Sequence, residues 1–281
     1  MDDFPMPIKF DKGHSTKFYN SSNNIKVTMV ASPTGDFRRR CYNQIKATWA
    51  NTPKDFEEIK QEDIDITFND LLSGKVLPNS MEMLQFTFLF EGLTLIEVTH
   101  LLRHRSFSAV HAQCSADRFL NDDSVFIPSS VEKSIFEERY KRLTEDCKQL
   151  YCEMVDSKEI SILDARYILN RNHRYFYYFT MNLKDAIAFI NQRKCSQIQP
   201  ELDNIIAHQV YDEIARIIPE IKNVVSLKCN ERCFYVSAPD KDNSRIYAPD
   251  VNHKKFVKKD LKTLYSKTRK EMGVFFNPQD I

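Results

Sequence analysis

Two segments of the chain alternate apolar and polar residues with the two-residue period of a half-buried strand. Residues 25–30 (IKVTMV) form the first segment, and residues 81–90 (MEMLQFTFLF), with phenylalanine recurring at alternate positions, form the second. Aromatic and β-branched side chains suit such a pleated surface. The turn-forming residues 32–36 and 91–92 mark the expected end of each segment. The pattern therefore predicts two strands of a sheet.

Apolar residues at helical spacing predict several helices, most of them after the second strand. Ser129 and Glu132 have the spacing of a capping box that would open the longest helix, and Asn182 is a suitable N-cap for another. The predicted helices cover residues 37–48, a short segment capped by Gly74, and residues 93–101, 129–155, 182–194 and 201–218. The expected buried side of the helix over 129–155 carries Ile135, Leu143, Cys147, Leu150, Tyr151 and Met154.

A few strands followed by several long helices are typical of an α+β fold, here a small mixed or antiparallel sheet packed with helices. Residues 25–220 contain these elements and are predicted to form one domain. Residues 1–24 are polar and irregular, which favours a loose arm or a simple hairpin. Residues 221–281 form a C-terminal extension with strand-like pieces at 223–227 and 234–237 and a Lys-rich tail.

The composition of the chain disfavours several common classes of binding site. The chain has 281 residues but only 5 glycines, and neither a GxGxxG nor a GxxxxGK[ST] motif occurs, which disfavours the common dinucleotide and P-loop sites. The net charge of +1 gives no overall attraction to nucleic acid or to a membrane. Apolar runs fall short of a membrane span, so we expect no membrane association.

The cysteines favour a reduced, cytoplasmic protein. There are 7 of them, an odd number at irregular spacings, and the acidic start of the chain does not resemble a signal peptide. Cys229 and Cys233 form a close pair, but further ligands for zinc are not evident near them. We therefore expect buried thiols and no metal.

Residues 99–119 (THLLRHRSFSAVHAQCSADRF) concentrate the polar chemistry of the chain. Arginines, histidines, hydroxyls and an amide are interleaved there without Gly or Pro. Planar cationic donors in such density suit a site for phosphates and a heterocycle. The ionisable members are Arg103, His104, Arg105, His111 and Arg118, and the other polar members include Ser106, Ser108, Gln113 and Ser115.

Other arginines are more ambiguous. Residues 38–40 are all Arg, which fits either a nucleic-acid patch or, as we prefer, a solvated helix face. Arg166 lies among apolar residues and is either paired structurally or directed into a pocket. Arg193 follows Asn182 by eleven residues, about three helical turns, so the two share a helix face.

At this point the residues resemble the flavin-dependent thymidylate synthases, the ThyX family. Arg103-His104-Arg105 matches the start of the family signature, Ser108 fits the following Ala-Ser, and Gln113-Cys114-Ser115 fits its Glu/Gln-x-Ser. Arg118-Phe119 corresponds to the closing Arg-Tyr. Before the signature, residues 82–88 resemble the family's Glu-His-x-x-Phe-Thr-Phe strand. Ordered blocks at matching spacings make this resemblance more specific than Arg-His-Arg alone.

The second half of the chain carries the resemblance further. Asp164-Ala165-Arg166 is similar to the family's Ala-Arg element, and Asn182-Leu183-Lys184 to its Asn-(Leu/Ala)-Arg. Arg193 closes the Phe-x-x-x-Arg that holds the family's catalytic arginine, and Gln199-Pro200-Glu201 resembles the Gln-x-Glu that follows. The resemblance covers roughly residues 25–220.

The resemblance implies FAD-dependent C5 methylation of dUMP to dTMP, with NADPH and methylene-tetrahydrofolate as co-substrates. It also implies a ThyX-like fold and a homotetramer with active sites between subunits. Arg193 would stabilise negative charge at the N3–O2 edge of uracil, and His104 would shape the pocket, carry protons or be structural. The implied cofactor contacts are Arg103, His104, Arg105, Gln113, Asn182 and Lys184. The implied substrate contacts are His100, Arg103, Gln113, Cys114, Ser115, Arg118, Arg166 and Arg193.

The chain also departs from the family pattern. The segment between Ser108 and Arg118 is longer than usual, and two family histidines are replaced by Leu77 and Met83. Ala188 stands where an asparagine usually contacts flavin, and His100 stands where glutamine is common. These changes motivate two alternatives. One is a hydroxymethylase on the same scaffold, acting on dUMP or dCMP. The other is a non-catalytic nucleotide-binding relative, with nucleic acid disfavoured as its ligand.

Overall fold

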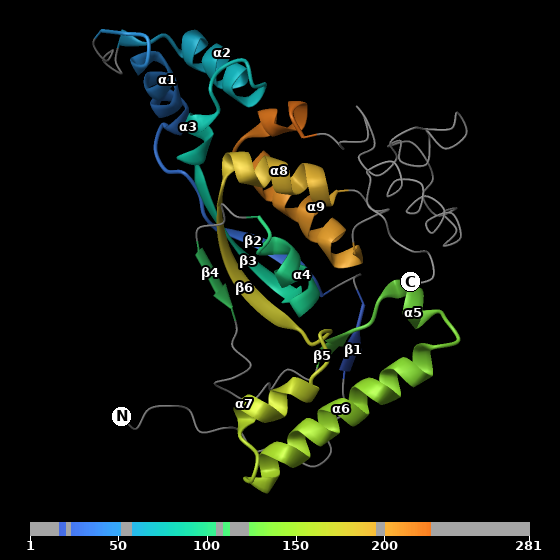
Figure 1. Ribbon diagram of the computed structural model, residues 1–281. Helices are drawn as coiled ribbons and strands as arrows, with labels where there is room; N and C mark the ends of the chain where they lie inside the picture. The colour runs from blue at the N-terminus through green and yellow to red at the C-terminus, as the bar shows by residue number, and fades with distance from the viewer. Residues whose placement is uncertain are drawn as a thin grey trace, which may run out of the picture.

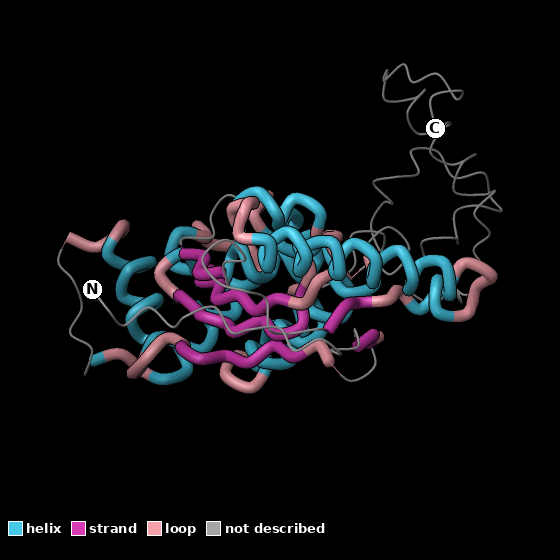
Figure 2. Tube along the Cα trace, turned by 90° about the horizontal axis from the view of Figure 1, so that it is seen from below, coloured by secondary structure: helices cyan, strands magenta, loops and turns pink. Residues whose placement is uncertain are grey.

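Antiparallel strands form the sheet at the centre of the molecule, and helices surround it (Figures 1 and 2). The computed structural model describes residues 17–20, 24–51, 58–104, 109–112, 124–194 and 200–225. Within them, four strands pair in the order β2-β3-β6-β4, and every pairing is antiparallel. These strands are β2 (Lys26–Ala31), β3 (Gln85–Leu93), β6 (Tyr175–Asn182) and β4 (Ala109–Ala112).

Most helices lie at the two ends of this sheet and along one of its faces (Figure 1). Helices α1, α2 and α3 lie together at one end, α5, α6 and α7 lie at the other, and α8 and α9 pack on each other and on the sheet. The α-helices are α1 (Phe37–Ala47), α2 (Gln61–Leu72), α3 (Asn79–Glu82), α4 (Leu95–Leu101), α5 (Ser129–Glu132), α6 (Glu137–Ser157), α7 (Ile162–Ala165), α8 (Leu183–Arg193) and α9 (Glu201–Ala215). The 3₁₀ helices are η2 (Arg166–Ile168) and η3 (Pro219–Asn223).

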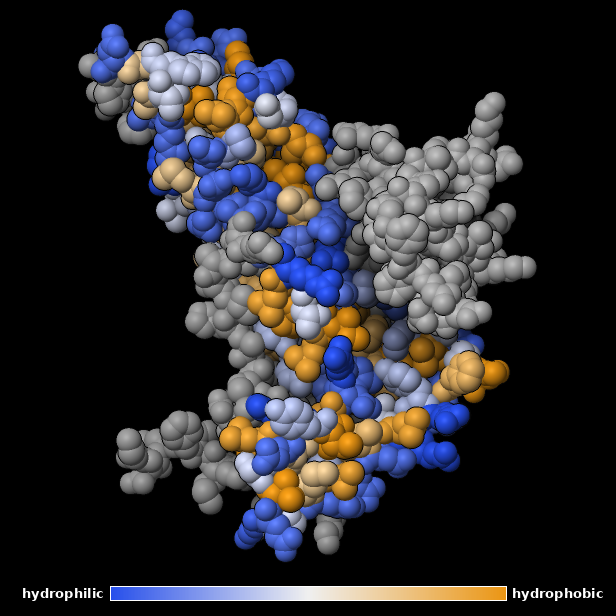
Figure 3. All heavy atoms as spheres, in the orientation of Figure 1, coloured by the Kyte–Doolittle hydropathy of each residue, from blue (hydrophilic) through white to orange (hydrophobic). Residues whose placement is uncertain are grey.

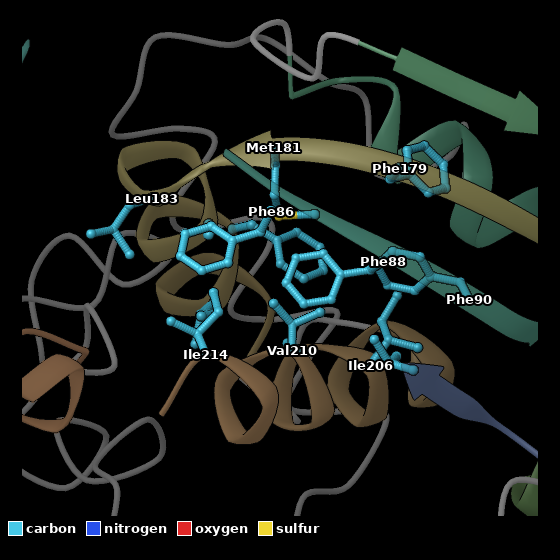
Figure 4. Close-up of a cluster of buried hydrophobic side chains, with 14 of the residues drawn as sticks. Phe86, Phe88, Phe90, Phe179, Met181, Leu183, Ile206, Val210 and Ile214 are labelled. Atoms are coloured by element: carbon cyan, nitrogen blue, oxygen red, sulfur yellow. The ribbon is translucent and has the colours of Figure 1, made fainter. Parts of the chain in front are cut away.

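The main core forms between the central strands and α9. Phe86, Phe88 and Phe90 are fully buried on one face of β3, as the alternation predicts. Figure 4 shows these rings beside Val210 and Ile214 of α9, which are also fully buried. Each side chain of this size contributes about 2 to 3 kcal/mol when it leaves water. The face that the sequence marks as apolar is therefore the one that binds helix to sheet.

The α+β class, the first strand and most predicted helices are confirmed, but the second strand differs at both ends. Met81 and Glu82, predicted as strand, belong to α3. The turn expected at 91–92 is instead an irregularity within β3, where the register with β6 shifts between Glu91 and Leu93. Gly92 allows this because it adopts a φ of +84°, and its carbonyl accepts a hydrogen bond from the Tyr19 hydroxyl at 3.0 Å.

The predicted capping box at Ser129 is wrong. Pro128 occupies the N-cap position of α5, and the Ser129 hydroxyl donates to Glu201 at 2.6 Å rather than capping its own helix. The helix stops after Glu132, and α6 begins only at Glu137. A contact with α9 therefore outweighs the local capping that the sequence favours.

Part of the stripe predicted to be buried on α6 faces outward. Leu143 and Leu150 are 50% and 42% exposed, and Ile135, which precedes the helix, is 93% exposed. Tyr151 alone of the predicted stripe is fully buried, in a small cluster with α7. Figure 3 shows apolar side chains among polar ones on the surface at the α6–α7 end. The apolar residues at helical spacing along α6 therefore include exposed side chains as well as buried ones.

The terminal segments also differ from expectation where they are described. β1 (Lys17–Tyr19) pairs in parallel with β5 (Ser124–Phe126), so this part of the predicted arm is no simple hairpin. Asn223 ends the helix η3, and residues 224–225 form no strand. The Lys-rich tail and the pair Cys229 and Cys233 lie outside the described residues.

The three consecutive arginines at 38–40 act locally. Arg38 donates to both carboxylate oxygens of Glu220, at 2.6 and 2.9 Å, and its guanidinium lies 4.8 Å from the centre of the Phe68 ring. Arg39 pairs with Asp36 at the start of α1, and Arg40 donates to the Thr34 carbonyl. The side chains are thus engaged within the chain, with Arg38 paired across elements, rather than simply solvated as the sequence predicted. Among the described residues, no helix is long and apolar enough to cross a membrane.

Candidate functional site

Three helix ends meet beside the sheet and bring ionisable side chains together. The end of α4 carries His100, the end of α8 carries Arg193, and the beginning of α9 carries Asp203. Both α4 and α8 pack against α9 (Figure 1). Because helix ends leave main-chain polar groups unpaired, charged side chains are well placed to satisfy them here.

Arg193 is buried at the centre of this junction. It is 6% exposed, and its Nη2 donates to the carbonyl oxygen of His100 at 3.3 Å. Its Nη1 lies 3.7 Å from Oδ2 of Asp203. A cation at the carboxyl end of a helix is favourable, because the last carbonyl groups carry partial negative charge. The guanidinium is therefore fixed between the main chain of α4 and a carboxylate on α9.

Asp203 is fully buried and makes the closest contact of the site. Its Oδ2 lies 2.5 Å from Nδ1 of His100. Its Oδ1 has no hydrogen-bond partner among the described residues. Burial raises the pKa of Asp203, whereas Arg193 and His100 oppose that shift. Arg193 and His100 thus stabilise the buried carboxylate of Asp203, and the carboxylate in turn orients both side chains.

Asp203 is not among the site residues predicted from the sequence. Its signal was available, since Asp203 precedes Ala207 and Val210 at the spacing of one buried helix face. An acid within an apolar face requires a buried partner. Glu201, which belongs to the Gln199-Pro200-Glu201 resemblance, has a structural contact instead, because its carboxylate accepts hydrogen bonds from the main chain and hydroxyl of Ser129.

His104 lies on the turn after α4 and contacts α8. Its ring packs edge-on against Phe189, with 5.4 Å between ring centres. Burial, and then the charge of Arg193, lower the pKa of His104 to about 4. Its imidazole is therefore neutral near pH 7. The proposed catalytic role of His104 stays a prediction, and any such role near neutral pH uses the uncharged ring.

A second buried acid, Glu97, stands one turn before His100. Its Oε2 accepts from the main-chain N–H and the hydroxyl of Thr94, at 3.0 and 2.5 Å, and closes a capping box at the start of α4. Burial raises the pKa of Glu97 to about 7, and the charge of Asp203 raises it as well. The junction thus contains two carboxyl groups whose pKa values both lie above the ordinary range.

The predicted cofactor contacts Asn182 and Lys184 lie at the other end of α8. Oδ1 of Asn182 accepts from the main-chain N–H of Asp185 at 2.9 Å, so its predicted role as N-cap is confirmed. Lys184 is exposed and pairs with Glu82 at 2.7 Å. At 1.5 Å per residue, α8 separates Asn182 from Arg193 by about 16 Å and Lys184 from Arg193 by about 14 Å along the helix axis.

A shallow apolar pocket lies near this end of α8, between α1 and α3. Its volume is about 190 Å³, and Trp49, Leu77 and Met83 contribute exposed side chains to its lining. The Gln44 amide donates to the sulfur of Met83 across it at 2.7 Å. The two positions that lack the family's histidines thus line one apolar hollow.

The other predicted contacts do not lie together in the described part of the chain. Arg103 is exposed on the turn after α4, close to the junction in sequence. Arg166 lies on η2 beside α6 and α7, at the end of the molecule away from α8 (Figure 1), with its guanidinium 5.8 Å from the Tyr167 ring centre. Predicted contacts that lie outside the described residues are Arg105, Gln113, Cys114, Ser115 and Arg118.

Comparison with known proteins decides the family. The family model described as thymidylate synthase complementing protein matches residues 31–220. The chain belongs to this family. The match confirms the resemblance to flavin-dependent thymidylate synthases, a family of methyltransferase-type enzymes, and it spans all three helix ends of the junction.

Individual relatives are distant but similar over most of their length. A flavin-dependent thymidylate synthase of Pyrococcus abyssi is 29% identical over 224 residues, which cover 74% of this chain and 86% of the relative. One from Pyrococcus furiosus is 25% identical over 226 residues, with coverages of 78% and 91%. This chain is therefore a divergent member of the family.

Solved structures share the fold. A UMP/dUMP methylase, PolB from Streptomyces cacaoi bound with 5-Br dUMP, superposes with a TM-score of 0.59 at 17% identity and covers 74% of this chain and 96% of that chain. Thymidylate synthase X from Helicobacter pylori with FAD and dUMP superposes with a TM-score of 0.52 at 14% identity, with coverages of 72% and 97%. At these identities the likeness establishes the ThyX-like fold.

Proposed function

We propose that this protein methylates dUMP at C5 to give dTMP, with FAD as cofactor and with NADPH and methylene-tetrahydrofolate as co-substrates. Family membership supports the reaction class. The observation that carries the proposal is the buried guanidinium of Arg193, fixed by Asp203 and by the His100 carbonyl. A preorganised cation is what the C5 chemistry of uracil needs, because negative charge develops at the N3–O2 edge as C5 becomes nucleophilic.

Arg193 acts electrostatically in this proposal. Arginine stays protonated in proteins and accepts no hydrogen bond, so it stabilises an anion without taking its proton. Its contact with Asp203 and its 6% exposure limit its freedom before substrate binds. Little reorganisation is then required at the moment of reaction, which is the main advantage of a preorganised group.

The residues near α8 suit a flavin dinucleotide. Oδ1 of Asn182 is used by the N-cap, but its side-chain NH₂ donates to no described residue and is available for a ring carbonyl. Exposed Lys184 and Arg103 offer cations for an anionic diphosphate. When bound, FAD supplies the reducing equivalents, and this chain contributes the donors that hold it. We propose Arg105 and Gln113 as further cofactor contacts.

We further propose that the site is completed in a homotetramer. Arg166, expected to contact substrate, lies far from Arg193 within one chain (Figure 1). The α6–α7 end that carries Arg166 also exposes Leu143, Leu150 and Leu163, which are 42–50% exposed. An apolar surface of this kind is typical of a subunit interface. A neighbouring subunit would then present Arg166, with Cys114, Ser115 and Arg118 as the other proposed substrate contacts.

Weighing the nucleotide product tests the function. The full chain is incubated with dUMP, methylene-tetrahydrofolate and FAD, with and without NADPH, and the product is identified by mass spectrometry. We expect dTMP, formed only with NADPH. A mass matching hydroxymethyl-dUMP would replace this proposal with the hydroxymethylase. Absence of product with dUMP, dCMP and UMP, from protein that binds nucleotide, would favour a non-catalytic binding protein.

A further inference from the structure

The imidazole of His100 is oriented like that of a general base. Its Nδ1 lies 2.5 Å from Oδ2 of the fully buried Asp203. A carboxylate can only accept a hydrogen bond, so in the neutral imidazole Nδ1 carries the proton and Nε2 presents its lone pair. The side chain keeps 21% exposure, and Nε2 bonds to no described residue. The ring is therefore partly exposed, and none of the described residues occupies the nitrogen that can accept a proton.

The same carboxylate oxygen orients a base and a cation. Oδ2 of Asp203 contacts both Nδ1 of His100 and Nη1 of Arg193, and Arg193 in turn donates to the main chain of His100. These contacts place the imidazole and the guanidinium side by side.

We propose that His100 removes the N3 proton of the pyrimidine substrate and that Asp203 is the positioning residue that prepares it. This inference rests on the proposed function, because it takes Arg193 to face the N3–O2 edge. The N3–H bond breaks, its electron pair stays on the ring, and the proton passes to Nε2. Arg193 then faces the anion, and the added ring charge makes C5 a stronger nucleophile toward the one-carbon donor. After C5 has attacked, Nε2 returns the proton to N3, which restores both the base and the neutral ring.

The neighbouring groups are poorly suited to this proton transfer. Arg193 is already protonated. His104 packs on Phe189, and its lowered pKa makes it a weak base. Glu97 uses its carboxyl group to cap α4. Among the described residues that meet at this junction, His100 alone combines a partly exposed imidazole with a hydrogen bond to a buried carboxylate.

The experiment follows the proton on the bound nucleotide. dUMP labelled with ¹⁵N at N3 is bound to the full chain, and the chain is labelled with ¹⁵N in histidine. NMR then reports whether N3 retains its hydrogen and whether an imidazolium forms. H100Q keeps a hydrogen-bonding group of similar size and removes the base. Asp203→Asn keeps the shape and removes the charge. His208→Gln is the matched control, because His208 is exposed on α9 and forms no described contact with His100, Arg193 or Asp203.

We expect N3 to lose its hydrogen, and one histidine to become imidazolium, in the wild type and in His208→Gln. In H100Q and Asp203→Asn, N3 should keep its hydrogen while calorimetry shows dUMP binding. Their kcat should fall by about a hundredfold or more, and it should recover at alkaline pH, where N3 ionises in water. A structural defect would not produce this recovery.

Several results would overturn the inference. It fails if N3 stays protonated on the wild type, or if H100Q deprotonates N3 and keeps its kcat. If dTMP forms while N3 stays protonated, the inference alone is wrong. If N3 loses its proton to His100 but no methylated product forms, the methylation proposal is wrong and the proton transfer stands. A chain that binds no pyrimidine nucleotide overturns both.

Discussion

Arg193 on α8 donates from Nη2 to the carbonyl oxygen of His100 at the end of α4, across 3.3 Å. This bond joins two helices that are separated by β6 and α6 in the sequence. Asp203 on α9 contacts the same guanidinium and the His100 ring. The junction is therefore both a structural link between three helices and the proposed centre of the chemistry.

Stability and activity should separate in a double-mutant cycle at Arg193 and Asp203. Arg193→Met or Asp203→Leu alone leaves the other charge buried with its main partner missing, so each should lower the free energy of unfolding by about 3 to 5 kcal/mol. The double variant should lose less than the sum. Urea unfolding measures the cycle. All three variants should lack methylation activity, and additive losses of stability would contradict the contact.

Glu97 should give the protein a measurable pH dependence of stability. Its pKa rises from 4.5 to about 7 on folding, so the folded state binds more protons between these values. Stability should therefore fall as pH rises from 4.5 to 7, by up to about 3 kcal/mol. Glu97→Gln accepts the same bonds from Thr94 and cannot ionise, so it should not show this loss.

The titration of His104 changes stability with pH in the opposite direction to that of Glu97, over a pH range that overlaps with the range of Glu97. Its pKa falls from 6.5 to about 4, so the folded state binds fewer protons and stability is lost as pH falls through this interval.

Comparing Glu97→Gln with the wild type by denaturant titration at several pH values isolates the Glu97 contribution. Parallel stability curves for the two proteins would show that Glu97 ionises normally.

Gly92 should tolerate no side chain. Its φ is +84°, and an added Cβ would collide with the carbonyl oxygen of Asn24. Gly92→Ala should therefore cost about 3 kcal/mol or more. Gly35 has a φ of +65° but open space around it, so Gly35→Ala should cost only about 1 kcal/mol. Thermal unfolding of the two variants distinguishes collision from backbone strain, and equal losses would refute the distinction.

Arg38 should matter for stability far more than its neighbour Arg39. Arg38→Met removes a paired contact with Glu220 and a cation–π contact with Phe68, for an expected loss of about 1 to 2 kcal/mol. Arg39→Met removes a pairing with the half-exposed Asp36 and should cost under about 0.5 kcal/mol. Equal unfolding midpoints for the two variants would argue against the structural role of Arg38.

The sequence pattern correctly predicted those helices and strands whose formation depends on residues close together in the chain. The alternation that ends at Phe90 predicted the buried face of β3, and Asn182 predicted the start of α8, because each depends on neighbouring residues alone. Ser129 was misassigned because its hydroxyl reaches Glu201, 72 residues away. A sequence pattern carries little information about a contact of that range.

The candidate site was predicted only in part for the same reason. Arg193 and His100 could be named from the family resemblance, and the structure brings them together. Asp203 was not predicted because an acid within an apolar helix face indicates a buried partner without indicating which residue that partner is. Leu143 and Leu150 were predicted to be buried because apolar spacing is the same for a core and for an interface.

The pairing of β3 with β6 has a consequence for synthesis of the chain on the ribosome. Phe88 lies opposite Phe179, so 91 residues separate the two partners. Contacts of such long range slow folding, because a large loop must close first. The phenylalanines of β3 emerge well before β6 and α9 are made, and nothing later in the chain can yet cover them. The nascent protein should therefore depend on chaperones that bind apolar segments until translation passes α9.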